Sequence, residues 1–156
     1  MKIIFLDFDG VMDTVNYNHY LSQQRLPGDD EFGTIFDPNC IQNLKRIVDE
    51  TGAEIVISSS WKYYMTYQDF LDMWSARGLP GFVKDVTPTP KESRKRGDEI
   101  DAWLNECHDE CQYVIIDDFD SRHFNEHQLS HLLVVNQFNG LDEETTEKAI
   151  RMLNAE

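Results

Sequence analysis

The sequence has few cysteines, few basic residues and no long apolar segment, and each shortage argues against a class of protein. No apolar run approaches the roughly 20 residues that a helix needs to cross a bilayer, so we expect no membrane partner. The three cysteines, Cys40, Cys107 and Cys111, lack the spacing of a disulfide framework, which predicts a reducing, cytoplasmic location. Only 14 basic residues face 29 acidic ones, and the net charge of -15 argues against a broad surface for nucleic acid.

The length of 156 residues predicts one domain, 1–156, with enough chain to bury a core. Short apolar runs alternate with helical patterns, and strands too apolar to be half exposed are typical of a parallel sheet. The predicted fold is therefore α/β, a three-layer Rossmannoid arrangement with five parallel strands and helices on both faces. The expected strands are residues 2–6, 53–57, 82–86, 113–116 and 132–135.

Residues 14–36 show no sustained hydrophobic period, and we expect a long loop or small flap there rather than a cap domain. Four of its side chains are candidates for substrate contact or are plain loop residues: Tyr17, His19, Tyr20 and Arg25. Helices are expected after the Asp37–Pro38 start signal and after the capping pattern of Thr66 and Asp69.

Polar side chains stand at the ends of three expected strands. Asp7 and Asp9 follow the first strand, Ser58 follows the second, and Asp117 and Asp118 follow the fourth. Ligands of open parallel sheets bind outside the carboxyl ends of the strands. We therefore expect these side chains to share one edge of the sheet.

Four carboxylates in one place would repel one another and raise one another's pKa unless a cation neutralised them. Mg²⁺ prefers oxygen ligands and is usually held by one or two carboxylates together with substrate phosphate. Aspartate can attack phosphoryl groups covalently, and a neighbouring carboxylate can protonate the leaving oxygen and later activate water. The sequence therefore predicts Mg²⁺ as a cofactor and phosphoryl chemistry at this edge.

A basic cluster interrupts the acidic sequence at residues 91–96, KESRKR, which holds four of the 14 cationic residues. Its residues either form the solvated entry to a helix or face a phosphate.

The ordered set of motifs resembles the haloacid dehalogenase (HAD) superfamily of phosphohydrolases. An apolar strand ends in Asp7-Phe8-Asp9, a second ends in Ser58, a basic residue heads a helix near Arg96, and a third strand ends in paired acids at 117–118. The segments SSSW, KRGDEI, YVIIDD and NGL are similar to the HAD domains of the Swiss Army Knife RNA repair group, and more distantly to the phosphatase half of polynucleotide kinase-phosphatases. The resemblance implies a HAD-like fold with a minimal cap.

The resemblance also implies residue roles. Asp7 would be the nucleophile that forms an aspartyl-phosphate, and Asp9 the general acid and base, with its backbone carbonyl on the metal. Asp117 and Asp118 would complete the Mg²⁺ site directly or through water, and which of them is the direct ligand stays open. Arg96 would orient the nucleophile and the phosphate, although many family members have lysine there.

Lys95 and Lys91 are the alternatives to Arg96. Ser58 would bind the transferring phosphoryl group, with Ser59 as the alternative because the strand could end one residue later. Ser60 and Trp61 follow as substrate-binding candidates. Trp61 together with Lys62 could hold a substrate base, and an ordinary core position for Trp61 is the competing interpretation.

Two further patterns invite a metal interpretation that we do not favour. The pair Cys107 and Cys111 with His108 lacks a fourth ligand at a recognised spacing. The histidines at 123, 127 and 131 recur every fourth residue, but the last already begins the expected final strand.

The predicted function is a Mg²⁺-dependent HAD-type phosphomonoesterase acting on a phosphorylated small molecule or nucleotide. One alternative is a phosphatase that processes nucleic-acid ends, which the small flap and the basic cluster favour and the acidic balance disfavours. Another is a non-catalytic binding module that uses the same pocket.

Overall fold

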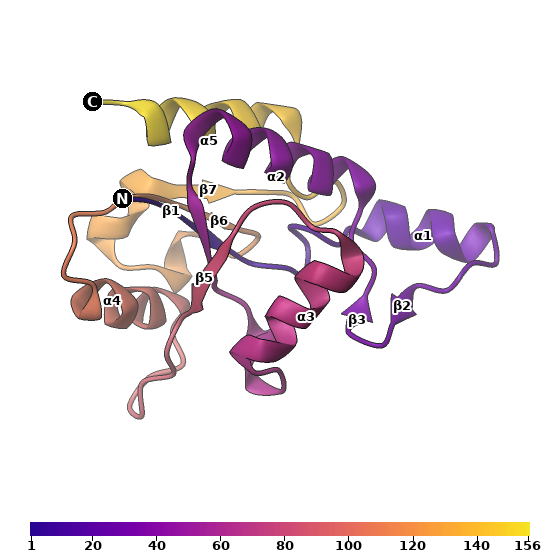
Figure 1. Cartoon of the computed structure of the whole chain (residues 1–156), viewed down its shortest axis with the longest axis horizontal. Helices are drawn as coiled ribbons and strands as arrows, with labels where there is room; N and C mark the ends of the chain where they lie inside the picture. The colour runs from indigo at the N-terminus through magenta and orange to yellow at the C-terminus, as the bar shows by residue number, and fades with distance from the viewer.

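The computed structural model describes all 156 residues. Its centre is a sheet of five parallel strands in the order β5-β4-β1-β6-β7, which confirms the predicted α/β fold (Figure 1). The first strand of the chain is therefore the middle strand of the sheet. The strands are β1 (Lys2–Leu6), β4 (Glu54–Ile57), β5 (Val83–Val86), β6 (Gln112–Asp117) and β7 (Leu132–Val134).

Helices cover both faces of the sheet because alternate strand residues point to opposite sides. On β1, Ile4 and Leu6 join a large core with α2 (Pro38–Thr51), α3 (Tyr67–Arg77) and α5 (Glu143–Asn154). The intervening Ile3 and Phe5 join a smaller core with α4 (Arg96–Glu106). Figure 1 shows α2 and α5 side by side on one face and α4 on the other. No helix is both long and apolar enough to cross a membrane.

The predicted helix boundaries are confirmed where capping signals defined them. Asp37 caps the start of α2 by accepting from the Asn39 N–H, and Gly52 ends that helix in the left-handed conformation. Thr66 and Asp69 form the expected capping box of α3.

Residues 14–36 contain more regular structure than the expected loop. They form the helix α1 (Val15–Gln23) and a two-stranded hairpin of β2 (Asp29–Asp30) and β3 (Gly33–Thr34). Only Leu21 of α1 is buried, so the helix leaves no apolar period in the sequence. Between β6 and β7 the chain forms two 3₁₀ turns, η2 (Ser121–His123) and η3 (Glu126–His131).

Candidate active site

The register of three strands places the candidate residues in one row. Leu6 of β1 pairs with Ile57 of β4 on one side and with Ile116 of β6 on the other. The next residues along these strands are Asp7, Ser58 and Asp117, and the Asp7 N–H donates to the Ile116 carbonyl at 3.2 Å. The predicted meeting of strand ends therefore follows from the pairing of the buried apolar segments.

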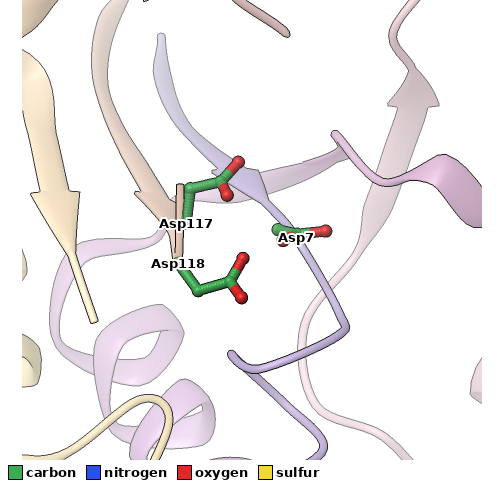
Figure 2. A group of neighbouring side chains, drawn as sticks. All are labelled: Asp7, Asp117 and Asp118. Atoms are coloured by element: carbon green, nitrogen blue, oxygen red, sulfur yellow. The ribbon is translucent and has the colours of Figure 1, made fainter. Parts of the chain in front are cut away.

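Three carboxylates gather at this row. Oxygen atoms of Asp7, Asp117 and Asp118 all lie within 4.8 Å of one another, and Figure 2 shows the three side chains around one space beyond the ends of β1 and β6. Asp7 is 4% exposed and Asp117 is fully buried, whereas Asp118 is half-buried. Hard carboxylate oxygens at this spacing fit a divalent cation such as Mg²⁺.

Gly10 allows the chain that follows the first strand to pack against this cluster. Its φ of 78° lies in the left-handed region, and a Cβ atom at this position would lie 2.5 Å from an Asp118 carboxylate oxygen. Any larger residue would therefore displace the Asp118 carboxylate from its place in the cluster.

Arg96, the first residue of α4, supplies the positive charge of the site. Its Nη1 lies 2.7 Å from Asp117 Oδ2 and 3.4 Å from Asp7 Oδ1, and it also donates to the Ser58 carbonyl at 2.9 Å. The side chain is 7% exposed and lies over the Phe119 ring. A single guanidinium thus links the ends of all three strands.

One arginine does not compensate three acids. Burial raises the pKa of Asp7 well above its ordinary value of 3.8, and the negative charge of Asp117 adds to this effect. Burial likewise raises the pKa of Asp117 to about 6, even though Arg96 favours its charged form. The cluster therefore lacks positive charge, as expected of residues that bind a cation.

The Asp9 carboxylate is not part of this group. Its Oδ1 accepts a hydrogen bond from Trp61 Nε1 at 3.1 Å, and Asp9 is exposed at the rim while Asp7 is buried. The two aspartates of the DxD motif thus have separate environments. Among the residues predicted to bind the metal, Asp9 is not brought together with the other three by its side chain.

Trp61 is a core residue. Its ring is 3% exposed and packs edge-on against Phe8 at 5.1 Å and beside Phe36 at 5.9 Å. No face of the ring remains for a substrate base, so stacking on a base is corrected to a core position. Its indole N–H instead fixes the Asp9 carboxylate.

The three serines after β4 differ in what their hydroxyls do. The Ser58 hydroxyl is buried and has no hydrogen-bond partner. The Ser59 hydroxyl accepts from the Trp61 backbone N–H and caps a 3₁₀ turn, η1 (Ser60–Tyr63). Ser60 is exposed. A buried hydroxyl without a partner costs free energy, so Ser58 is the serine whose environment leaves room for a ligand's hydrogen bond.

The alternative cations lie elsewhere. Lys95 is exposed and donates to Asn125 Oδ1 at 2.8 Å, and Lys91 is also exposed. Neither forms an ion pair with the carboxylate cluster, so the structure brings Arg96 alone to Asp7.

A family described as the HAD domain in Swiss Army Knife RNA repair proteins matches residues 3–146. The chain belongs to this family. Neither the curated proteins nor the solved structures compared with it gave a match. Membership of this HAD family suggests a phosphohydrolase, and the matched range includes every residue of the cluster and Arg96.

Sequence reasoning missed Asp13 in this HAD domain. Burial and the neighbouring Asp9 carboxylate together raise the pKa of Asp13 to about 8. Asp13 Oδ1 accepts from the Gly10 N–H at 3.3 Å, and residues 9 and 13 form an isolated β-bridge. The sequence feature that could have indicated Asp13 is a further acid four residues after Asp9, in the segment that connects the first strand to the next helix.

A buried ion pair behind Arg96 was also missed. Lys62 Nζ lies 2.7 Å from Glu99 Oε2, both side chains are under 5% exposed, and Lys62 also donates to the Thr87 hydroxyl. Lys62 is therefore a structural residue and not the proposed clamp for a base. The signal for Glu99 was its place one turn after Arg96 on the buried face of α4.

The competing metal interpretations find no support in the HAD domain. Cys107 and Cys111 are free thiols with their sulfur atoms 3.4 Å apart. The three histidines contact different residues. His123 packs against Phe119, His127 contacts Asp101, and the His131 ring stacks on the Tyr113 ring at 3.9 Å between centres. The carboxylate cluster is the one group of potential metal ligands in the chain.

Proposed function

We propose that the protein is a Mg²⁺-dependent phosphomonoesterase that acts through an aspartyl-phosphate at Asp7. The observation that carries the proposal is the arrangement at the three strand ends. It combines a buried carboxylate cluster, a guanidinium 3.4 Å from Asp7, and a buried serine hydroxyl without a partner. These three elements suit phosphoryl transfer, because catalysis there rests on positioning and on compensating negative charge.

The metal would be held by Asp7 and Asp118, with the Asp9 backbone carbonyl as a further ligand. Both oxygens of Asp117 already have partners, since Oδ2 accepts from Arg96 and Oδ1 from the Phe119 N–H at 2.9 Å. Asp118 has no ion-pair partner and is half-buried, which makes it the direct carboxylate ligand of the pair. When bound, Mg²⁺ would neutralise the cluster and keep Asp7 in its carboxylate form.

In the first step an Asp7 oxygen attacks phosphorus, and the bond between phosphorus and the leaving oxygen breaks. Ser58 and Arg96 hold the phosphoryl oxygens during this step. Asp9 gives a proton to the leaving oxygen, and its position at the exposed rim lets it reach that atom. The Trp61 indole N–H holds the Asp9 carboxylate for this role.

In the second step water attacks the phosphorus of the aspartyl-phosphate. Asp9, now ionised, takes a proton from that water, and the bond between phosphorus and Asp7 breaks. Inorganic phosphate leaves, and both aspartates return to their starting states. The nearby carboxyl of Asp13, with its raised pKa, limits the charge that accumulates around Asp9.

The substrate would be a phosphorylated small molecule or nucleotide. A phosphatase for nucleic-acid ends is the second candidate, because the matching family is described by RNA repair. The excess of acidic residues, 29 against 14 basic, weighs against a long nucleic-acid contact.

The proposal is tested by phosphate release from p-nitrophenyl phosphate with Mg²⁺ and with EDTA. We expect turnover only with Mg²⁺, and we expect Asp118→Asn to raise the Mg²⁺ concentration needed for half-maximal rate by about 10-fold or more. The matched control is Asp49→Asn on the exposed side of α2, which should leave the Mg²⁺ requirement unchanged. A rate that is equal with EDTA would refute the metal assignment, and no turnover under any condition would favour a binding module.

A further inference from the structure

A cavity opens beside the carboxylate cluster. Its volume is about 440 Å³, and its wall is formed by Ser60, Tyr63, Arg94, Arg96, Glu99, Phe119 and His123. Arg96 contacts Asp7 and Asp117, and the Phe119 N–H donates a hydrogen bond to Asp117. Two residues of the cavity wall therefore contact the carboxylate cluster directly. A phosphate held at Asp7 would therefore lie next to this cavity.

Three rings line the cavity, although it lies at the surface of the molecule. Tyr63 is 51% exposed and Phe119 is 38% exposed, and the rings of Phe119 and His123 lie 4.5 Å apart. The Tyr63 hydroxyl donates to Glu99 at 2.9 Å, which anchors that side chain to α4. Exposed aromatic rings held in place are suited to stacking on a flat ring of a ligand.

Arg94 adds a positive charge to the same wall. Its guanidinium lies 5.4 Å from the centre of the Tyr63 ring, and it has no carboxylate within ion-pair distance. Arg96, by contrast, pairs with Asp7 and Asp117 of the cluster. Arg94 is therefore free to bind an anionic group of a ligand.

We propose that this cavity binds the leaving group, and that Tyr63, Phe119 and Arg94 select one that combines a flat aromatic ring with a second negative charge. A nucleotide that carries another phosphate has this chemistry, either free or at the end of a polynucleotide. The inference rests on the proposed phosphatase activity, because it assigns the leaving group of that reaction.

The test compares kcat/KM for four phosphomonoesters with Mg²⁺. Glycerol phosphate has no ring, p-nitrophenyl phosphate has a ring without a second phosphate, and adenosine 3′,5′-bisphosphate has both. A 3′-phosphorylated oligonucleotide, compared with the bisphosphate, shows whether the enzyme prefers a polynucleotide end or a free nucleotide. We expect the bisphosphate or the oligonucleotide to exceed p-nitrophenyl phosphate by about 10-fold or more, which corresponds to one ring or charge contact.

Variants assign that preference to residues. Arg94→Gln should lower kcat/KM about 10-fold for the substrates with a second phosphate and leave p-nitrophenyl phosphate within about 2-fold. Tyr63→Leu should weaken all ring-containing substrates, whereas Tyr63→Phe keeps the ring and should retain the preference. Arg151→Gln, on the exposed side of α5, removes the same charge away from the cavity and should change nothing.

The proposal would be overturned if Arg94→Gln lowered kcat/KM equally for all four substrates, or left kcat/KM for the bisphosphate unchanged. Titration calorimetry of the bisphosphate against wild type and Arg94→Gln keeps the test independent of turnover, with weaker binding expected for the variant. If p-nitrophenyl phosphate is hydrolysed but the variants do not discriminate, only the leaving-group assignment fails. If nothing is hydrolysed but Arg94 still governs binding, the phosphatase proposal fails instead.

Discussion

Replacing Arg96 by methionine should destabilise the protein strongly, and Mg²⁺ should restore part of the loss. The guanidinium is 7% exposed and binds Asp117 at 2.7 Å, Asp7 at 3.4 Å and the Ser58 carbonyl at 2.9 Å. Methionine fills a similar volume but leaves two buried carboxylates without their cation.

The magnitude follows from the burial of this ion pair. Removing one partner of a buried pair costs about 3–5 kcal/mol, because the other charge stays buried without compensation. A domain of this size has about 5–15 kcal/mol of total stability, so the loss would be a large share of it. Arg96→Lys keeps the positive charge but lacks the planar guanidinium that donates several hydrogen bonds at once. We expect it to lower the free energy of unfolding, but by less than Arg96→Met does.

The assay is urea unfolding at neutral pH, with EDTA and with Mg²⁺. We expect the midpoint of Arg96→Met to fall in EDTA and to recover partly with Mg²⁺, because the metal replaces the missing positive charge. Arg122→Met is the control, since that arginine pairs with Asp120 at the exposed surface and its loss should not move the midpoint. Equal midpoints for Arg96→Met and wild type in EDTA would refute the reasoning.

Three further predictions concern single groups of the site. Ser58→Ala should lower kcat/KM by about 10-fold or more without lowering the unfolding midpoint, because the buried hydroxyl has no partner in the free protein; a loss of stability would contradict this. Trp61→Phe should lower kcat more than it changes KM, since it removes the hydrogen bond that fixes Asp9, and an unchanged kcat would argue against this positioning role. The metal-free protein should lose stability as the pH rises from about 4 to about 6. The pKa of Asp117 is raised to about 6 in the folded state, so between these pH values the folded chain binds this proton more tightly than the unfolded chain does. The urea midpoint of Asp117→Asn should vary less across this range than that of wild type.

The sheet and the main site residues could be predicted because both follow from buried apolar runs. Once β1, β4 and β6 pair in register, the residues after Leu6, Ile57 and Ile116 must share one edge. Capping signals such as Thr66 with Asp69 marked helix ends for the same local reason, since each satisfies backbone groups nearby in the sequence.

The features that escaped prediction depend on contacts between distant segments or on surfaces that stay exposed. The helix α1 buries only Leu21, so hydrophobic periodicity could not reveal it. The pairing of Lys62 with Glu99 joins η1 to α4 and leaves no local pattern. The sequence left Trp61 open between a core position and a contact with a substrate base, because its packing on Phe8 follows from no local spacing.

The central claim is that Asp7 attacks the phosphate within a metal-binding cluster. The most direct measurement is the rate of p-nitrophenyl phosphate hydrolysis by Asp7→Asn with Mg²⁺, compared with wild type and with the exposed control Asp49→Asn. Loss of a covalent nucleophile should lower kcat by about 1,000-fold or more, while Asp49→Asn stays at the wild-type rate. Wild-type turnover by Asp7→Asn would contradict the account.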